Sequence, residues 1–401
     1  MQSCKSNSSR IRPLALAALL CWGTASAEIS DTIHPFVALG YTYDDNLLRL
    51  PGDAAGVEQR SDRATQAQAG FIVDRPFGRQ RLTGRAKVSR VTFDHFDQLD
   101  YNGKDFAADL AWQLGNHFSG NLGGTYMQTL TPFSDFHTED RNLRTTRNKY
   151  ANGAWRFHPS WQVRGSFSRN KFDYELQAQR VNNRTEDMSE AGVDYLAPSG
   201  SKIGLVARRL NGHYDITRRI GGVVTRNDYT QDELKANITW LVSGVTQVNV
   251  LAGYAKREYE FITARDSSGA NGRVTVIWAP TGKLRFNGAA WREFSAVEST
   301  FVTNSLNKGG SLGATLAISG KVQANASVRR ETREFDQVES VVFTGDPRDR
   351  IGGSTLGLTW APTNSIQISA TAFRDKRTGT VLVGTSDYRA KGVSLSASGQ
   401  F

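Results

Sequence analysis

The chain has 401 residues, with 49 lysines and arginines against 39 aspartates and glutamates, a formal net charge of +10 and a mean hydropathy of -0.44. A low mean hydropathy is typical of a soluble protein. It also fits a membrane β-barrel, in which only every second residue of each strand meets lipid. Both cysteines, Cys4 and Cys21, precede residue 28, which excludes a disulfide, a thiol nucleophile or a thiolate metal site in residues 28–401.

Residues 1–27 have the pattern of a secretory signal peptide. Basic residues up to Arg12 precede the apolar stretch Pro13–Trp22, which is about half as long as a membrane-spanning helix. Small residues then lead to a cleavage position after Ala27. Cys21 follows a leucine, where a lipoprotein cleavage site needs a small residue, so we expect no lipid anchor. The excess of positive charge suits an anionic partner, and export from the cytoplasm argues against nucleic acid.

After residue 28, short turn signals built on Pro, Gly and Asn recur about every 40 residues, a spacing that a propeller blade also has. A blade needs tight turns throughout, whereas every second connection here is long and polar, as at Thr131–Asn142, Asp266–Asn271 and Asp336–Asp349. Alternating short turns and long loops are typical of outer-membrane barrels. The short turns are centred near Gly78, Asn116, Pro159, Ser199, Gly244, Thr281, Gly320 and Thr363.

Eight short turns join sixteen strands, and one strand near Pro35–Tyr43 and another at Lys391–Phe401 complete the count. The sequence therefore predicts an all-β fold: a transmembrane antiparallel β-barrel of about 18 strands over residues 28–401, in the bacterial outer membrane. An even number of strands places both termini in the periplasm.

The strands alternate with period two between apolar and polar side chains. The segment Gly392–Phe401 does so and ends on an aromatic ring, which suits a lipid-facing strand with its last residue at the membrane interface. An edge strand of a secreted β-sandwich is the alternative for this segment. The same alternation occurs at Leu234–Trp240, Arg273–Trp278, Leu312–Ile318 and Val322–Arg329.

Five tryptophans stand just before short turns, on the apolar phase of their strands. Indole is amphipathic and settles at the level of the lipid headgroups, so this shared register predicts a periplasmic aromatic girdle. The alternative is a set of unrelated core tryptophans. The five are Trp112, Trp155, Trp240, Trp278 and Trp360.

Nine basic residues fall on the phase expected to face the lumen, and Asp109 and Asp194 are the clear acids there. Guanidinium groups along a pore wall concentrate anions and form forked hydrogen bonds to carboxylates. Alternatively, these residues pair with loop acids and simply make the wall soluble. The pore-lining candidates are Arg85, Lys87, Arg164, Lys202, Lys235, Arg273, Arg285, Lys321 and Arg329.

No pattern points to catalysis, a cofactor or a metal. The histidines are isolated, and no serine has a sequence context that marks it as a nucleophile. The segment Asp97–Gly103 has oxygen ligands at alternating positions but lacks the distal carboxylate of a calcium loop, so a solvated turn is the preferred reading. We expect a protein that is not an enzyme.

The first strand reads Phe36-Val-Ala-Leu-Gly-Tyr-Thr-Tyr-Asp-Asp-Asn-Leu-Leu-Arg-Leu50. This segment, above all Tyr43–Leu50, resembles the EpsL-type outer-membrane proteins of exopolysaccharide operons, within a wider group of β-barrel porins. The resemblance implies movement of an exopolysaccharide across the outer membrane and no catalytic residues. The Asp44-Asp45-Asn46 cluster would lie where the first strand meets its outer loop, either in a role of its own or simply forming a turn.

These observations predict passive export of an acidic polysaccharide through a basic-lined lumen, with outer-membrane lipid and periplasmic or inner-membrane export components as partners. Two alternatives stay open. One is a diffusion porin for small anionic solutes, which a long loop tucked into the lumen would favour. The other is a closed structural or adhesive barrel.

Overall fold

The computed structural model forms one closed antiparallel barrel of 18 strands. The predicted signal peptide and the cleavage after Ala27 lie outside the described residues. The structure describes residues 32–52, 60–134, 137–220, 223–261, 263–296, 304–335, 348–379 and 385–401.

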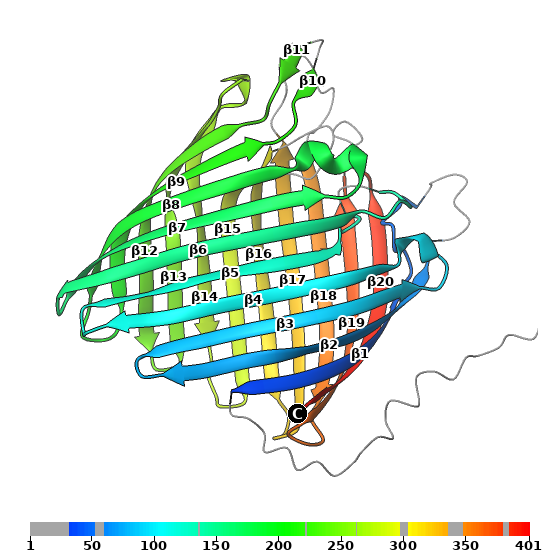
Figure 1. Ribbon diagram of the computed structural model, residues 1–401, viewed down its shortest axis with the longest axis horizontal. Helices are drawn as coiled ribbons and strands as arrows, with labels where there is room; N and C mark the ends of the chain where they lie inside the picture. Colours follow the sequence, from blue (N-terminus) through cyan, green and yellow to red (C-terminus); the bar gives the residue numbers. More distant parts are fainter. Residues whose placement is uncertain are drawn as a thin grey trace, which may run out of the picture.

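Consecutive strands pair along the whole wall, and the barrel closes where the first strand pairs with the last (Figure 1). The barrel strands are β1 (Ile33–Asp44), β2 (Asp62–Phe77), β3 (Gln80–Phe93), β4 (Tyr101–Leu114), β5 (Phe118–Leu130), β6 (Leu143–His158), β7 (Trp161–Tyr174), β8 (Arg184–Leu196), β9 (Lys202–Tyr214), β12 (Tyr229–Ser243), β13 (Thr246–Tyr259), β14 (Ser267–Trp278), β15 (Leu284–Ala296), β16 (Asn304–Ala317), β17 (Val322–Phe335), β18 (Arg348–Trp360), β19 (Ile366–Thr378) and β20 (Tyr388–Gln400).

Shorter elements lie in the connections at one end of the barrel, which we call the loop end. The hairpin β10 (Arg218–Ile220) and β11 (Val223–Thr225) joins β9 to β12, which themselves pair directly. Three short 3-10 helices, η2 (Asp97–Leu99), η3 (Gln177–Asn182) and η4 (Thr263–Arg265), lie in other connections. None of the helices in the described ranges is long and apolar enough to cross a membrane.

The opposite end, which we call the short-turn end, carries the tight turns. All eight predicted turn centres fall in short connections there, and Gly78 and Gly200 adopt φ values of 62° and 82°, a region that favours glycine. The prediction of a loop at Asp266–Asn271 was wrong, because β14 begins at Ser267 and the connection precedes it. Most of the predicted loop Asp336–Asp349 lies outside the described residues.

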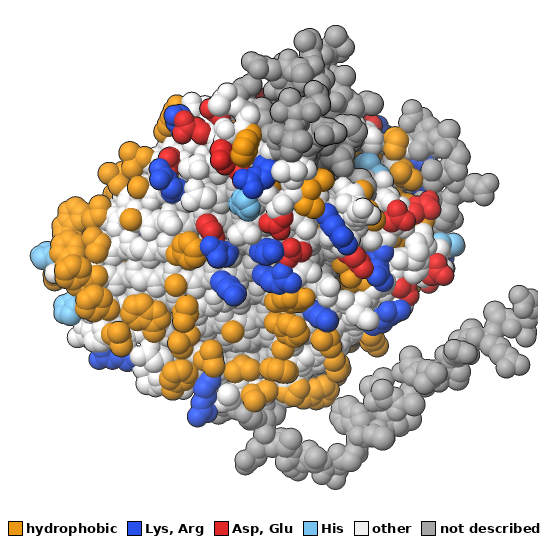
Figure 2. Space-filling view, turned by 45° about the horizontal axis from the view of Figure 1, so that its top comes forward, with side chains coloured by type: hydrophobic (Ala, Val, Ile, Leu, Met, Phe, Trp, Pro, Cys, Tyr) orange, Lys and Arg blue, Asp and Glu red, His pale blue; other side chains and the backbone are white. Residues whose placement is uncertain are grey.

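Strand register divides the side chains into two faces. One face carries large apolar side chains with no cover, such as Leu39, Leu234 and Leu356, which are 57, 61 and 63% exposed. These rows point outward, and on the face shown in Figure 2 apolar side chains gather in a band along its left and lower parts. So much apolar area would be unfavourable in water at about 25 cal/mol per Å², but it is suited to lipid.

The pairing of β1 with β20 confirms the predicted alternation of the last strand. Leu39 lies opposite Ala397 and Tyr41 opposite Leu395 on the outward face. On the inward face, Thr42 lies opposite Ser394, and the two hydroxyls are 2.9 Å apart. The seam of the barrel is therefore apolar towards the outside and polar towards the lumen.

Candidate functional site

The inward face forms the wall of the lumen. Cross-strand partners share a face, so the register settles where the nine basic candidates lie. Lys321 is outside the wall, in the turn between β16 and β17, where its ammonium donates to the carbonyl of Pro362 at 2.9 Å. The register places the other eight on the inward face: Arg85, Lys87, Arg164, Lys202, Lys235, Arg273, Arg285 and Arg329.

Most of these basic side chains have acidic neighbours on the same face. The Arg85 guanidinium lies 2.9 Å from the Asp105 carboxylate, and the Lys87 ammonium lies 3.4 Å from it. Asp194 lies within 4.0 Å of the Lys202 ammonium. Sequence reasoning recognised Asp194 but missed Asp105. Continuing the two-residue period along each strand would have found that acid and also Glu190, Glu233, Glu293 and Glu331.

Alternating charges run across the inner wall from β7 to β12. Arg164 pairs with Glu190, and Glu190 lies 3.1 Å from Arg208 on the next strand. Arg208 in turn lies 3.0 Å from Glu233, whose carboxylate is 2.8 Å from the Lys235 ammonium. This track sets basic and acidic side chains alternately along the inner wall, so each cation is balanced by a carboxylate.

A second group surrounds the buried indole of Trp291 on β15. Arg273 and Arg329 lie over its ring at 4.9 and 5.1 Å. Its Nε1 donates to the Glu331 carboxylate at 2.9 Å, and Glu331 also binds Arg329 at 2.7 Å. The indole therefore holds two guanidiniums at fixed positions on the wall.

Water reaches this level of the lumen. The inward side chains of Arg85, Arg273 and Arg329 are 51, 44 and 57% exposed. Arg285 is also exposed and has no ion pair within the described ranges. Exposed ion pairs are weak and exchange readily, so these guanidiniums stay accessible from the solvent.

The loop end of the lumen is packed instead. Leu48, Phe96, Leu99 and Phe133 form a buried apolar cluster, with Leu99 fully buried. These residues come from the connections that follow β1, β3 and β5. The cluster therefore ties three connections together at the mouth.

The segment Asp44–Leu50 folds as a tight turn that delivers Leu48 to this cluster. Asn46 donates its backbone N–H to Asp44 at 2.9 Å, and its amide donates to the carbonyls of Leu50 and Arg389 at 2.8 and 3.0 Å. Arg49 adopts a φ of 58° and binds Asp44 at 2.8 Å. The Asp-Asp-Asn cluster thus forms a turn, the reading that sequence analysis left open.

The described parts of the connection between β5 and β6, residues 131–134 and 137–142, make contacts at the mouth. The carbonyl of Ser134 accepts a hydrogen bond from Arg377 on β19, which pairs with Asp349 on β18. Both side chains point inward, both are 0% exposed, and Thr385 donates to Asp349 at 2.8 Å. Strands β1 to β4 and β20 lie between these walls, so the connection crosses the lumen side of the mouth.

Two further side chains, His137 and Arg141, hold this connection through hydrogen bonds. His137 bonds to the carbonyl of Leu48 at 2.9 Å through Nδ1 and to the Ser386 hydroxyl at 3.2 Å through Nε2. Arg141 donates to Glu175 at 2.7 Å, and this hydrogen bond raises the pKa of the guanidinium above its ordinary value. The crossing segment is therefore held by β19 and by the connections that follow β1, β7 and β19.

A tyrosine cluster lies on the other side of the mouth. Tyr214, Tyr229 and Tyr259 are buried together on β9, β12 and β13. The buried Arg257 guanidinium lies over the Tyr229 ring at 4.3 Å and donates to Gln231 at 2.7 Å. The mouth is thus narrowed from both sides.

The predicted girdle tryptophans all lie on the outward face, close to the short-turn end: Trp112, Trp155, Trp240, Trp278 and Trp360.

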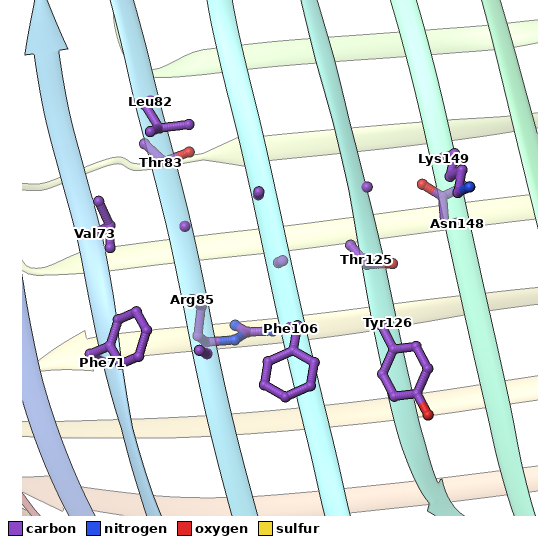
Figure 3. Close-up of a pocket in the computed structure, with 15 residues that line it drawn as sticks. Phe71, Val73, Leu82, Thr83, Arg85, Phe106, Thr125, Tyr126, Asn148 and Lys149 are labelled. Carbon is purple, nitrogen blue, oxygen red and sulfur yellow. The ribbon is translucent and has the colours of Figure 1, made fainter.

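A hollow of about 490 Å³ also opens on the outward face, where Phe71, Phe106 and Tyr126 border the small residues Gly84 and Ala108 (Figure 3). It faces away from the lumen and lies outside the candidate path.

In the described part of the chain, no group of three or more His, Cys, Asp or Glu side chains could hold a metal ion. Asp97–Leu99 forms η2, and the strand β4 begins at Tyr101, within the segment that offered alternating oxygen ligands. The chemistry of the lumen is therefore that of charged and aromatic side chains.

A closed sheet with a lipid-compatible outer band and a charged inner wall is the architecture of a transmembrane β-barrel of the bacterial outer membrane. Residues 211–401 match the sequence model of the family described as "Putative beta-barrel porin 2".

Solved structures show the same fold. The outer membrane protein OpdK from Pseudomonas aeruginosa superimposes with a TM-score of 0.50 at 10% identity, covering 92% of this chain and 99% of that one. OccK2 (OpdF) from the same organism gives a TM-score of 0.50 at 10% identity, with 92% and 98% covered. No curated protein matches the sequence significantly.

Proposed function

We propose that this porin is a passive diffusion channel for small anionic solutes. The observation that carries the proposal is the hydrogen bond from the inward-pointing Arg377, which pairs with Asp349, to the carbonyl of Ser134 in the connection between β5 and β6. On this proposal, the connection limits the path to small solutes. Below it, exposed guanidiniums supply weak cationic positions along the wall.

The mechanism needs no energy source. An anion is drawn towards the basic wall, exchanges between cationic positions and leaves, because each carboxylate partner keeps the binding weak. The pore-lining role of Arg85, Arg273, Arg285 and Arg329 belongs to this proposal. So does the orientation with the short turns, the girdle tryptophans and both termini in the periplasm, which the pattern of short and long connections supports.

Export of an acidic polysaccharide is the second candidate. The likeness of Tyr43–Leu50 to EpsL-type proteins favours it, together with export components as partners. A polymer would need Thr131–Asn142 to leave the mouth. Leu48, which lies in the EpsL-like segment Tyr43–Leu50, packs in the apolar cluster that holds this connection. The crossing connection therefore favours small solutes over a polymer in the state described.

Planar-bilayer recordings test the proposal. We expect an open channel with anion preference, and a shift of the reversal potential in a salt gradient towards neutrality in the variant Arg273→Gln/Arg285→Gln/Arg329→Gln. The matched control, Arg147→Gln/Arg169→Gln/Arg209→Gln, removes three charges from the outward face and should keep the preference.

Three results would argue otherwise. No conductance would indicate a closed structural or adhesive barrel. Equal anion preference in both triple variants would mean that the wall charges do not steer the permeant. Passage of long acidic oligosaccharides at the rate of small carboxylates would favour the polymer candidate.

A further inference from the structure

Strands β17 to β20 carry an unusual group of charges on their outward face. Arg374 lies eight residues beyond Ile366 at the short-turn end, and eight residues of tilted strand span roughly 20 Å of height. This places the group at the upper edge of the apolar band, just above Leu356 and Val328. We call it the basic face: Arg330, Arg350, Arg374, Lys376, Arg389 and Lys391.

The register sets like charges directly opposite each other. Arg374 lies across from Lys391, and Lys376 lies across from Arg389. Such pairs destabilise a sheet unless an anion lies between them. Sheet pairing alone gives no reason for this arrangement, so it indicates a ligand.

A hollow of about 460 Å³ opens within the basic face. Gly352 lies between Arg330 and Lys376 in one cross-strand row, and its missing side chain leaves the floor open. Arg350 and Arg374 complete the lining. Among the described residues, none of these four basic side chains forms an ion pair, and all four are exposed.

The far wall of the barrel provides a contrast at a similar height. There Arg147 lies 2.5 Å from Asp173, Arg169 lies 2.6 Å from Asp187, and Arg209 lies 2.7 Å from Asp232. Basic and acidic side chains also lie beside each other on the face shown in Figure 2. Those guanidiniums already have partners.

Near the basic face, Asp45 and Asp387 are the closest carboxylates among the described residues of these connections. Each accepts a backbone N–H, from Lys391 at 2.7 Å and from Gly379 at 2.7 Å. Glu334 shares the outward phase of Arg330 on β17 and pairs with Lys308 at 2.7 Å. Among the described residues, the six basic side chains therefore outnumber the carboxylates near them.

We propose that the basic face binds the phosphate groups of a phosphorylated glycolipid in the outer leaflet of the membrane. Guanidiniums form forked hydrogen bonds to phosphate, and basic residues at the edge of a bilayer attract anionic headgroups. The acyl chains would lie along the apolar rows below, beside Leu356 and Val328. The proposal rests on the orientation proposed above, with the long connections outside the cell, and it is independent of what passes through the lumen.

Native mass spectrometry of the whole protein in neutral detergent tests the proposal, with bisphosphorylated lipid A as the probe. We expect the wild type to retain this lipid. The variant Arg330→Gln/Arg350→Gln/Arg374→Gln/Lys376→Gln should bind it on the order of 100-fold more weakly, since each basic side chain near an anionic surface contributes several-fold.

The matched control, Arg147→Gln/Lys149→Gln/Arg169→Gln/Arg209→Gln, removes the same charge from the far wall and should keep the binding. Heat-modifiable migration on gels checks that all three barrels are folded. Equal loss in both variants, or equal binding of the dephosphorylated lipid, would overturn the proposal. Competition by millimolar inorganic phosphate as strong as by the lipid would show a free-anion site, and burial of the face in a stable oligomer would show a protein interface instead.

Discussion

Two arginine–carboxylate pairs on the inner wall have the same chemistry and opposite surroundings. Arg377 and Asp349 at the mouth are 0% exposed, and they hold the carbonyl of Ser134. Arg273 and Glu293 in the lumen are 44 and 33% exposed and are 2.6 Å apart. The exposure of each pair to water sets the difference. The buried pair fixes a segment of chain, whereas the exposed pair leaves the Arg273 guanidinium in contact with solvent, as the proposed anion path requires.

The largest effect is expected from breaking the dry pair. Arg377→Met leaves Asp349 buried without its partner, which typically costs about 3–5 kcal/mol. We expect the connection Thr131–Asn142 to leave its dock, and the single-channel conductance to rise. The control Arg273→Met, at the wet pair, should leave the conductance level almost unchanged. An unchanged conductance in Arg377→Met would show that this pair does not hold the constriction.

A smaller effect is expected from the apolar side of the same dock. Leu48→Ala removes a buried side chain from the cluster and should weaken it by about 2–5 kcal/mol. Limited proteolysis of the folded barrel should then cut Thr131–Asn142 faster. Leu39→Ala, on the outward face, is the matched control and should leave the cleavage rate as it is. Equal rates in both variants would exclude Leu48 as an anchor.

The smallest effect is expected from releasing the wet pair. Glu293→Gln frees Arg273 from its carboxylate, and an exposed pair contributes only about 0–1 kcal/mol, so stability should hardly change. The anion preference should increase, seen as a larger reversal potential in a salt gradient. A reduced preference would mean that Glu293 positions Arg273 rather than screening it.

The fold could be predicted from the sequence because its signals are local. Proline and glycine mark the turns, and a two-residue period marks each strand, so the strand number and the faces follow from short windows. The lumen was predicted less well. Eight of the nine basic candidates lie on the inward face, whereas Lys321 lies in a turn, and acids such as Glu293 and Glu331 were not assigned to the lumen phase.

The crossing connection could not be predicted in this way. Arg377 and Ser134 are 243 residues apart in the chain, and no local pattern links them. Their contact depends on the curvature of a closed barrel, which brings β5 and β19 to face one mouth. Long-range contacts of this kind appear only once the whole sheet is assembled.

The turn after β1 also sets the timing of assembly. Asn46 donates to the carbonyl of Arg389, a residue 343 positions later, so this turn cannot be completed before the last strand has docked on the first. Leu48 lies in the same turn, so the apolar cluster at the mouth cannot form completely until this turn is in place. Since ordering such a distant contact is a late step, the barrel should first close with a wide mouth and narrow only afterwards.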